Sequence, residues 1–449
     1  MLCINYLKLQ IKMLNKKYYH LITIGCAMNK ADSERVANFL ETNNYLEKPE
    51  WLDTDIIILT TCGIRQSAED RVYGLVNQIR KTNKTAAVVI TGCLSKRKDV
   101  MRRLIGQVDL FMPINELPNM FELLKTAKPE KVLSLDEVRE LGGEKYLSIV
   151  PKYDSEYTAC VPIGNGCNNF CSYCVVPYAR GREVYRNAEE IITEVKSLIK
   201  KGYKEIILLA QNVNSYQSDG YNFPKLLIEL NKIPGQFWIR FSSSHPKDVS
   251  EELIDAIGLC EKVANHLHLA VQSGDNKMLE LMNRKYTAEH YRDLITKVRA
   301  VKPGISITTD LIVGFPGESE KQFEASVNLF KDLKFEMGYI SQYSPRPGTV
   351  SWNMLDNVSR EEKKVRDKII TDILKETSLE ANKNLVGKEF EVLVDGVKKN
   401  GKLYGKTSSS KNIMFISDNK KPEELIGQFV KVKIDKALTF GLAGTLILE

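Results

Sequence analysis

The chain of 449 residues is poor in histidine: it has five, and none lies between His20 and His245. Structural zinc in proteins is normally held by four Cys or His ligands. Within that histidine-free stretch, the loop from Cys167 to Cys174 contains only three cysteines. Cys160 is a conceivable fourth ligand, but it lies in the strand-like segment before the loop. The loop therefore favours a group that needs three protein ligands over a four-ligand zinc site.

Long apolar runs are also missing, because no segment holds enough uninterrupted apolar residues for a transmembrane helix. Lysines interrupt the apolar patches of residues 1–26, and no small-residue cleavage site follows, so we expect no secretory signal. We therefore expect a cytoplasmic protein without a membrane partner, in which clustered cysteines bind metal more often than they form disulfides. Met13 is a possible alternative start, which makes residues 1–17 a predicted extension that contains Cys3.

The excess of charge of one sign is small. The 64 Lys and Arg residues exceed the 57 Asp and Glu residues, which gives a formal net charge of +7. This excess permits a polyanionic partner without requiring one. The length exceeds the size at which a single core keeps growing, so we expect two or three domains.

Residues 18–148 are predicted to form an α/β domain, because short apolar strands alternate with amphipathic helices. Such units build a parallel sheet that is covered by helices. Cys26, Cys62 and Cys93 each lie at the carboxyl end of one strand, in "HLITIGC", "DIIILTTC" and "AAVVITGC". These ends line one edge of a parallel sheet, so the three thiols can converge on one point. The alternative is three unconnected core residues, since free cysteine is often buried.

Residues 152–380 contain six strand-like segments separated by helical patterns, which predicts a partial (β/α)6 barrel. The segments are "YTACVPIG", "KEIILLAQN", "FWIRFSSS", "HLHLAVQS", "ISITTDLIVGF" and "EMGYISQYS". The three-cysteine loop follows the first of them. Barrel chemistry takes place on loops at the carboxyl ends of strands, so this position favours a functional loop.

Residues 384–449 change to short alternating strands with Gly, Asn and Lys turns, which predicts a small all-β barrel of the oligonucleotide-binding kind. From residue 382 onward there are twelve Lys, no Arg and eight acidic residues, a net charge of about +4. A basic cluster surrounds Tyr404, which permits a polyanionic partner, and a solubilising surface is the alternative. The cluster comprises Lys398, Lys399, Lys402, Lys406 and Lys411.

The loop cysteines have the spacing C-x3-C-x2-C, which suits a cubane iron–sulfur cluster with three thiolate ligands and one open iron. With Tyr173 before the last cysteine, this loop resembles that of the radical S-adenosylmethionine (SAM) superfamily, in which the open iron binds SAM. The resemblance implies that Tyr173 and further residues at later strand ends contact SAM, and some of these could instead cap helices. The further residues are Gln211, Ser243, Gln272 and, in "DLIVGFPGE", Gly314.

From residue 18 onward, the order of the three predicted domains resembles the methylthiotransferases. The matching stretches include "GCAMNKADSE", "TTCGIRQSAEDRVYG", "GCLSKR", "CNNFCSYCVVPYARGRE" and "YSPRPGT". "QNVNSY" and "HLHLAVQSG" most resemble the MiaB-type branch, which acts on N6-isopentenyladenosine beside the anticodon of tRNA. The C-terminal domain resembles a TRAM module, which implies a grip on the RNA backbone.

This resemblance implies SAM and two [4Fe–4S] clusters, one on Cys167, Cys171 and Cys174 and an auxiliary one on Cys26, Cys62 and Cys93. It also implies methylthiolation through a carbon radical at or near C2 of the adenosine. The expected partners are the anticodon stem-loop of tRNA and an electron donor such as flavodoxin or ferredoxin, and we expect a monomer. Candidates to hold phosphate or cofactor carboxylate are Arg180, Arg182 and Arg346, although each could be a surface charge.

Three positions depart from the family pattern: Ala27, Gly63 and Tyr185 stand where other residues are usual. They affect the expected substrate or subtype more than the chemistry. The nearest alternative is the same reaction on threonylcarbamoyl adenosine or on an aspartate of a ribosomal protein. An alternative of another class is a non-enzymatic RNA-binding protein that uses metal only structurally. For Cys160 and Cys260 we expect structural roles.

Overall fold

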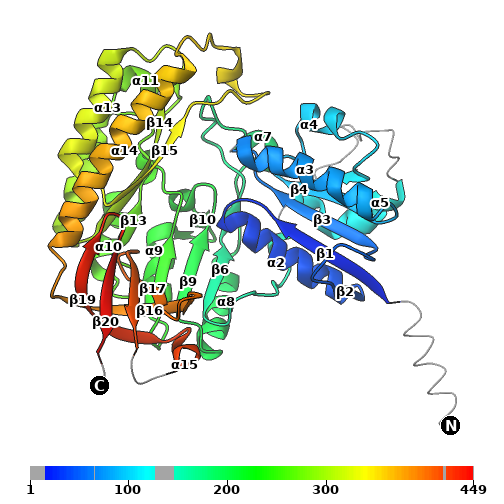
Figure 1. Ribbon diagram of the computed structural model, residues 1–449, viewed down its shortest axis with the longest axis horizontal. Helices are drawn as coiled ribbons and strands as arrows, with labels where there is room; N and C mark the ends of the chain where they lie inside the picture. The colour runs from blue at the N-terminus through cyan, green and yellow to red at the C-terminus, as the bar shows by residue number, and fades with distance from the viewer. Residues whose placement is uncertain (1–15, 65, 127–145, 418–420, 448–449) are drawn as a thin grey trace.

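The computed structural model describes residues 16–64, 66–126, 146–417 and 421–447. Most of the predicted extension, with Cys3, and residues 127–145 lie outside the described residues. The described elements form three units, and Figure 1 shows the N-terminal unit beside strand β6 of the central barrel, with the C-terminal barrel at the lower end of the central one. No helix in these ranges has both the length and the apolar character needed to cross a membrane.

The N-terminal unit is a five-stranded parallel sheet in the order β2-β1-β3-β4-β5. Its strands are β1 (Lys17–Thr23), β2 (Tyr45–Glu47), β3 (Ile56–Thr61), β4 (Ala87–Gly92) and β5 (Leu110–Phe111). Its helices are α2 (Ala27–Thr42), α3 (Gln66–Thr82), α4 (Lys98–Arg103), η1 (Ile114–Asn119) and α5 (Met120–Thr126). The predicted parallel sheet is confirmed. The three-residue strand β2 was not predicted.

Both faces of this sheet are covered, because successive side chains of a strand point to opposite faces. In β3, Ile56 and Ile58 belong to a core with α2 and α5, whereas Ile57 and Leu59 belong to a core with α3 and α4. A strand that is buried on both faces reads as a continuous apolar run, which is the pattern of β3 and β4.

The central unit is the predicted partial barrel. Its two parallel sheets, β12-β9-β6 and β13-β14-β15, are joined by isolated parallel bridges such as Ser244 with Leu269. The strands are β6 (Thr158–Pro162), β9 (Glu205–Leu209), β12 (Trp238–Phe241), β13 (His266–His268), β14 (Ser306–Val313) and β15 (Met337–Gln342). Strands β6 and β15 therefore form its two edges. A shared core of strand and helix side chains fills the space between the barrel strands and their outer helices.

Helices and short hairpins connect these strands. The helices are α7 (Val176–Arg180), α8 (Ala188–Lys200), α9 (Phe223–Asn231), α10 (Glu251–Leu259), α11 (Asn276–Leu281), α12 (Ala288–Val301), α13 (Glu320–Leu333) and α14 (Arg360–Lys383). The short 3-10 helices are η2 (Val213–Ser215), η3 (Pro246–Asp248) and η4 (Val350–Asn353). The hairpins pair β7 (Gly164–Asn165) with β8 (Val184–Tyr185), and β10 (Gln217–Ser218) with β11 (Tyr221–Asn222).

The C-terminal unit is a closed five-stranded barrel in the order β16-β17-β18-β20-β19, as predicted. Two glycines allow its strands to cross closely: a Cβ on Gly405 would lie 2.2 Å from the Leu393 carbonyl oxygen, and one on Gly444 would lie 2.2 Å from that of Lys433. Its elements are β16 (Glu389–Val397), β17 (Leu403–Thr407), β18 (Asn412–Ile416), α15 (Pro422–Leu425), β19 (Phe429–Leu438) and β20 (Gly441–Leu446).

The C-terminal barrel docks at the amino ends of the central strands. Arg240 forms an ion pair of 2.6 Å with Glu205, the first residue of β9, and donates to the carbonyl oxygens of Thr407 and Ser408. The Tyr157 hydroxyl, just before β6, donates to the Asp395 carbonyl oxygen at 2.9 Å. The three-cysteine loop follows the carboxyl end of β6, so the two lie at opposite ends of the central barrel.

The N-terminal unit packs against the β6 side of the central barrel through helix α2. Met28 and Ala31 of α2 form a small core with Cys160 of β6 and Leu209 of β9. Cys160 is thus a buried packing residue at the junction of the two units. Cys260 lies in the core of the central unit. Both positions are consistent with the structural roles expected for these two thiols.

The same junction buries the carboxyl group of Glu34. One of its oxygens accepts from the Asp154 backbone N–H at 3.3 Å, and Oε2 has no hydrogen-bond partner among the described residues. Burial raises the pKa of Glu34 from 4.5 to about 7, because the charged carboxylate is poorly solvated. The folded chain therefore keeps a proton between pH 4.5 and 7 that the unfolded chain has lost. Stability falls as the pH rises through this window.

We predict that the effect of Glu34→Gln on the free energy of unfolding is more stabilising at pH 8 than at pH 5.5 by up to about 2 kcal/mol. The titration window from pH 5.5 to 7 spans about 1.5 pKa units, and each unit corresponds to about 1.4 kcal/mol. The measurement is the melting temperature of variant and parent at both pH values under anaerobic conditions. Glu50→Gln, at an exposed carboxyl, is the matched control and should show no pH-dependent difference. An equal effect of Glu34→Gln at both pH values would contradict the assignment.

Candidate metal and substrate site

Three cysteines lie together at the carboxyl edge of the N-terminal sheet, and we name them the N-terminal triad: Cys26, Cys62 and Cys93. Cys62 directly follows β3, Cys93 directly follows β4, and Cys26 is the N-cap residue of α2. A Cβ on Gly25 would lie 2.8 Å from Cys62 Cβ, and one on Gly63 would lie 3.2 Å from Cys93 Cβ. The three cysteine loops therefore pack directly on one another, as the strand positions predict.

Backbone and amide contacts hold these loops in place. The Asn29 side chain donates to the Ile24 carbonyl oxygen at 2.6 Å, and Asn29 Oδ1 lies 3.8 Å from Cys26 Sγ. The Ile64 N–H donates to Cys62 Sγ at 3.4 Å. Gly92 has a φ of 84°, and a Cβ there would lie 2.5 Å from the Thr61 carbonyl oxygen. The loop before Cys93 therefore approaches the end of β3 more closely than other residues would allow.

The second set of cysteines, which we name the loop triad, is Cys167, Cys171 and Cys174. A backbone crossing closes this loop: Gly166 has a φ of 84°, and a Cβ there would lie 2.0 Å from the Arg182 carbonyl oxygen. The Cys167 N–H donates to the Gly181 carbonyl oxygen at 3.1 Å. The start and end of the segment from 166 to 182 thus lie side by side.

Two side chains from other parts of the barrel contact the loop triad. Arg284 is buried and its Nη1 lies 3.5 Å from Cys171 Sγ, which suits a negatively charged sulfur. Tyr173 packs with Met278, Phe315 and Tyr343, so it joins the loop to the "DLIVGFPGE" segment. The structure therefore brings together the two motifs that the sequence analysis predicts to contact SAM.

The two triads face each other. Burial raises the pKa of Cys167 to about 11, and it raises the pKa of Cys174 further, with smaller contributions from Cys171, Cys167 and Cys93. Cys93 belongs to the N-terminal triad, so its sulfur lies close enough to act on the loop triad. Buried thiols resist ionisation unless positive charge is present. A metal centre would supply that charge, so the buried thiols of Cys167 and Cys174 suit metal ligation.

No three His, Cys, Asp or Glu side chains in the described ranges gather closely enough to hold a single metal ion.

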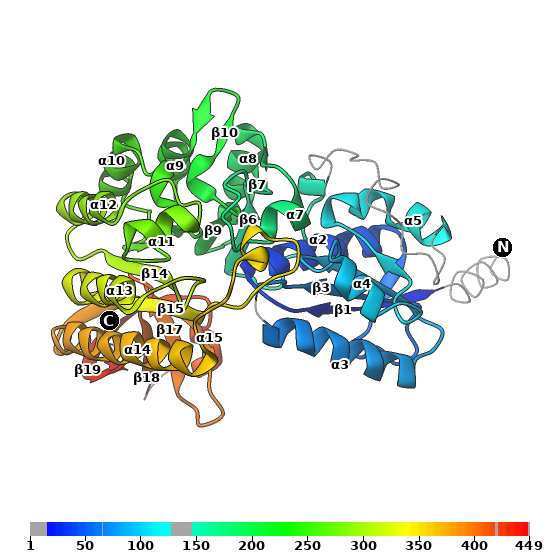
Figure 2. The ribbon, with the colours of Figure 1, turned by 90° about the horizontal axis from the view of Figure 1, so that it is seen from above.

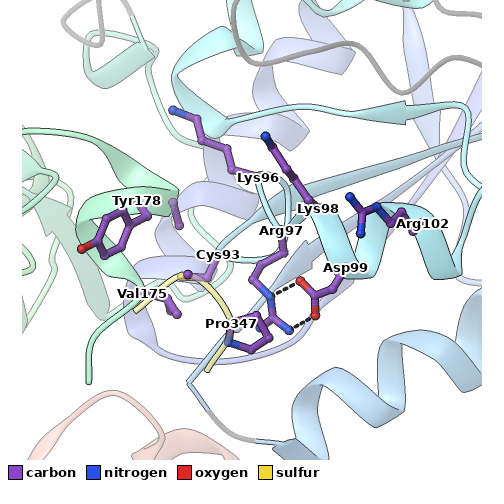
Figure 3. A pocket seen from close by; sticks show the side chains of 11 residues that line it. Cys93, Lys96, Arg97, Lys98, Asp99, Arg102, Val175, Tyr178 and Pro347 are labelled. Atoms are coloured by element: carbon purple, nitrogen blue, oxygen red, sulfur yellow. Dashed lines mark hydrogen bonds and ion pairs between the residues drawn. The ribbon is translucent and has the colours of Figure 1, made fainter. Parts of the chain in front are cut away.

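A cavity of about 460 Å³ is lined by Cys93 of the N-terminal triad and by Val175, the residue directly after Cys174 of the loop triad. Its walls come from the segment after Cys93, from residues 175–179 beside the loop triad, and from Pro347 and Gly348 after β15. Figure 3 shows Cys93 near the centre, with Tyr178 on one side and Lys98 and Arg102 on the other. The walls carry four cationic side chains and one carboxylate, a balance of +3: Lys96, Arg97, Lys98, Arg102 and Asp99. Such a cavity suits a flat, anionic ligand.

Unpartnered polar atoms gather at the carboxyl ends of β9 and β12. Four buried side chains there have an oxygen or nitrogen without a partner among the described residues: Gln211, Asn212, Ser244 and His245. Buried polar groups are almost always satisfied, so these atoms indicate a missing polar ligand. His245 Nδ1 accepts from the Lys247 N–H at 3.2 Å, which leaves the hydrogen on Nε2. Burial lowers the pKa of His245 to about 2, so it is a neutral donor.

These atoms lie close to the loop triad. The His245 ring stands edge-on to Tyr286 at 5.5 Å, and the Tyr286 hydroxyl accepts from Arg284 Nε at 2.8 Å. Arg284 in turn contacts Cys171. The polar atoms of SAM are a fitting ligand for this region.

The other predicted SAM contacts have different surroundings. Ser243 and Gln272 both adopt a positive φ, 66° and 69°, and strained residues of this kind concentrate at functional sites. The Gly314 N–H donates to Glu318 Oε2 at 2.7 Å, and a Cβ on Gly314 would lie 2.3 Å from Lys363. The visible role of Gly314 is therefore to let Lys363 approach.

Three predicted phosphate or RNA contacts are corrected by the structure. Arg180 is buried and forms an ion pair of 2.6 Å with Asp32. Arg346 is buried and donates to Gln66 Oε1 and to the Ile64 carbonyl oxygen. Lys406 lies 3.9 Å from Glu205 and 3.5 Å from Asp395, so two carboxylates already neutralise it. Arg180 and Arg346 are therefore buried away from an external phosphate, whereas Lys406 is partly exposed and shares its charge with two carboxylates.

The remaining predicted contacts stay plausible as exposed groups. Arg182 is exposed and lies over the Phe170 ring at 4.7 Å, beside the loop triad. Lys398, Lys399 and Lys402 are exposed at the turn between β16 and β17. The structure shows where these side chains are and does not test what they bind.

Sequence reasoning missed several residues of the site. Lys96, Lys98 and Arg102 follow Cys93 in a visibly basic run, which was a usable signal. Arg284 and His245 lie far from any cysteine in the sequence, so no local pattern could have found them. Tyr185, one of the departures, packs against Gly164, where a Cβ would lie 2.8 Å from its ring. Gly63 lets the Cys62 and Cys93 loops approach each other.

Family models match three parts of the chain. An uncharacterized protein family, UPF0004, matches residues 18–113, the radical SAM superfamily matches 161–330, and the TRAM domain matches 383–447. Among solved structures, the radical SAM methyltransferase TsrM from Kitasatospora setae has a TM-score of 0.52 at 15% identity, covering 75% of this chain and 77% of its own. The radical SAM enzyme OxsB has a TM-score of 0.53 at 14% identity, covering 81% and 56%. These structures show the fold alone.

Curated relatives match along nearly the whole chain, and those cited here are named tRNA-2-methylthio-N(6)-dimethylallyladenosine synthase. The protein of Thermoanaerobacter pseudethanolicus is 42% identical, and the match covers 96% of this chain and 93% of the relative. That of Carboxydothermus hydrogenoformans is 38% identical, covering 96% and 100%. That of Acetivibrio thermocellus is 39% identical, covering 99% and 94%.

We predict that Gly166→Ala abolishes metal binding by the loop triad, because the new Cβ would collide with the Arg182 backbone. Gly181→Ala is a matched control: its φ is also 84°, but nothing lies within 4 Å of its Cβ position. It should cost about 1 to 3 kcal/mol from backbone strain alone, because its ψ of −165° lies in a region that glycine alone adopts readily, and it should keep the metal. Iron and sulfide per chain after anaerobic reconstitution provide the measurement. Equal loss of iron in both variants would refute the argument from close approach.

Proposed function

Because this chain belongs to the family of tRNA-2-methylthio-N(6)-dimethylallyladenosine synthases, we propose that it methylthiolates C2 of N6-isopentenyladenosine beside the anticodon of tRNA by radical SAM chemistry. One observation carries this proposal: Cys93 of the N-terminal triad and the segment directly after Cys174 of the loop triad, which come from different units, line one cationic cavity. The names of the relatives favour this substrate over threonylcarbamoyl adenosine or a protein aspartate.

The loop triad would hold one [4Fe–4S] cluster with SAM, and the N-terminal triad would hold a second, auxiliary cluster. When bound, these groups supply an electron, a carbon-centred radical, a methyl group and sulfur. The radical is needed because no ordinary base can deprotonate an aromatic C2–H bond. Arg284 would stabilise negative charge on Cys171, to which it already points. His245 and Gln211 would orient the polar groups of SAM through their unpartnered atoms.

The substrate adenosine would enter the cavity between the triads. Bases of single-stranded loops are recognised when they are splayed out and stacked on aromatic rings. Tyr178 is half exposed at the cavity and would stack with a base there. Lys96, Lys98 and Arg102 would bind the flanking phosphates, and Arg182 lies beside the same loop. Burial of Cys62, Cys93 and Cys167 would limit the access of water to the reacting atoms.

The C-terminal barrel would hold the RNA backbone through Lys398, Lys399 and Lys402. We further propose that the chain acts as a monomer, because one copy supplies both triads and the cavity between them. Reduction requires an external donor, for which a flavodoxin or ferredoxin is the natural class.

Three cysteine variants test the reaction. Expressed in a host that lacks tRNA thiomethylation, the parent should produce 2-methylthio-N6-isopentenyladenosine, detected by mass spectrometry of tRNA nucleosides. Cys62→Ala should lose this product and keep reductive formation of 5′-deoxyadenosine, whereas Cys174→Ala should lose both. Cys260→Ala, a buried thiol outside both triads, should keep both. Methylthiolated product from Cys62→Ala would refute the role of the N-terminal triad.

A triple variant tests the RNA contact of the C-terminal barrel. Each Lys–phosphate contact releases counterions, so Lys398→Ala, Lys399→Ala and Lys402→Ala together should lower the slope of log affinity against log salt by about 2 to 3. tRNA binding across a salt series is the measurement. Lys406→Ala is the control, because its ammonium is already neutralised. An unchanged slope in the triple variant would place the RNA elsewhere.

A further inference from the structure

Two buried arginines link the central barrel to the N-terminal unit from opposite sides. Arg180 ends helix α7 in the loop-triad segment, which follows the edge strand β6. Arg346 lies in the segment that follows β15, the other edge strand. Figure 2 shows the segment after β15 reaching across to the N-terminal unit. Arg180 contacts helix α2, whose N-cap residue is Cys26, and Arg346 contacts the loop that follows Cys62.

Arg180 connects the Cys26 loop to the loop triad. Its Nη2 donates to Asp32 Oδ2 at 2.6 Å and to Asn29 Oδ1 at 3.1 Å, and its Nη1 donates to Asn165 at 3.0 Å. The Arg180 and Asp32 side chains are only 2% and 0% exposed. Asn29 also fixes the Ile24 carbonyl oxygen, directly before the Cys26 loop. One guanidinium therefore spans both cysteine segments.

Arg346 connects the segment after β15 to the loop that follows Cys62. It donates to the Ile64 carbonyl oxygen at 2.7 Å and to Gln66 Oε1 at 2.6 Å, and it lies 4.0 Å from Glu69. A tight turn holds its backbone: the Thr349 N–H donates to the Arg346 carbonyl oxygen at 3.2 Å, and Gly348 has a φ of 87°. Pro and Gly at the two central positions are the sequence of a type II turn. The guanidinium is therefore presented from a rigid support.

Stability alone is a poor explanation for these contacts. A buried ion pair often contributes no more than apolar side chains of the same volume would, because both charges lose their hydration. Arg240 provides a contrast, since it is equally buried at an interface but contacts the C-terminal barrel at the far end of the strands. Only Arg180 and Arg346 of these three contact the cysteine loops. Both hold a segment next to a cysteine of the N-terminal triad, so both can influence where that triad lies.

We propose that Arg180 and Arg346 are positioning residues that fix the separation and orientation of the N-terminal triad relative to the loop triad. This inference rests on the proposed function, in which groups held by the two triads must meet at one substrate atom. Transfer between them needs alignment, and a displacement of about 1 Å can reduce a rate by about 100-fold. Formation of the radical needs only the loop triad and its SAM.

The test separates these two steps. The variants are Arg346→Met, and Arg180→Met combined with Asp32→Asn so that no buried charge is left unpaired. With RNA that contains N6-isopentenyladenosine, methylthiolated product per 5′-deoxyadenosine should fall at least about tenfold. Without RNA, iron content and 5′-deoxyadenosine formation should stay within about twofold of the parent. Arg346→Lys, which keeps the charge and one donor, should recover part of the product ratio.

Arg240→Met is the control for generic destabilisation, and its product ratio should equal that of the parent. Pulsed electron paramagnetic resonance adds a second readout, since the spin interaction between the two reduced clusters depends on their separation. Both positioning variants should change it, and Arg240→Met should not. An unchanged product ratio and spin interaction in the positioning variants would overturn the proposal, as would loss of radical formation without RNA. If the parent itself makes no methylthiolated product, the proposed function fails, and the spin interaction still decides the positioning role.

Discussion

Parallel strands deliver their carboxyl ends to one edge of a sheet, and the site depends on two such edges meeting. The N-terminal sheet places Cys62 and Cys93 directly after β3 and β4, and the central barrel places the loop triad after β6. Packing of α2 against β6 turns the two edges towards each other. Neither unit contains the whole site. The junction between them therefore has to be specified as accurately as a core, although it is built largely from polar groups.

That junction is expensive in electrostatic terms. Burial raises the pKa values of Cys167, Cys174 and Glu34. Burial also removes Arg180 from water, so its charge is stabilised only by its protein partners. Buried charges cost free energy unless each one is paired and hydrogen-bonded. The arginines meet this condition through Asp32, Asn29 and the loop backbone. The thiols do not meet it by themselves, which is a physical reason for them to bind a positively charged centre.

Much of this arrangement is predictable from the sequence, because it follows local rules. Apolar runs marked the strands of all three units, and cysteines just after those runs had to lie at strand ends. The three-residue strand β2 was missed because it has no hydrophobic pattern of its own. The pairing of Arg180 with Asp32 spans 148 residues, and that of Arg346 with Gln66 spans 280. A sequence pattern records the charge of such residues and leaves their burial undetermined, so both looked like surface cations.

Lys406 illustrates the same limit on the opposite side of the molecule. It belongs to a run of lysines that resembles an RNA-binding surface, yet Glu205 and Asp395 neutralise it where the C-terminal barrel docks.

That docking leaves the turn with Lys398 and Lys402 exposed at the amino end of the central strands, while the cavity lies at their carboxyl end. Strand β14 has eight residues and so spans roughly 26 Å. An RNA that reached both basic regions would have to extend along the barrel by a comparable distance. A stem of several base pairs with a flipped loop base is long enough to do so, and an isolated nucleoside is not. The distance between the two regions thus favours a structured RNA as the substrate.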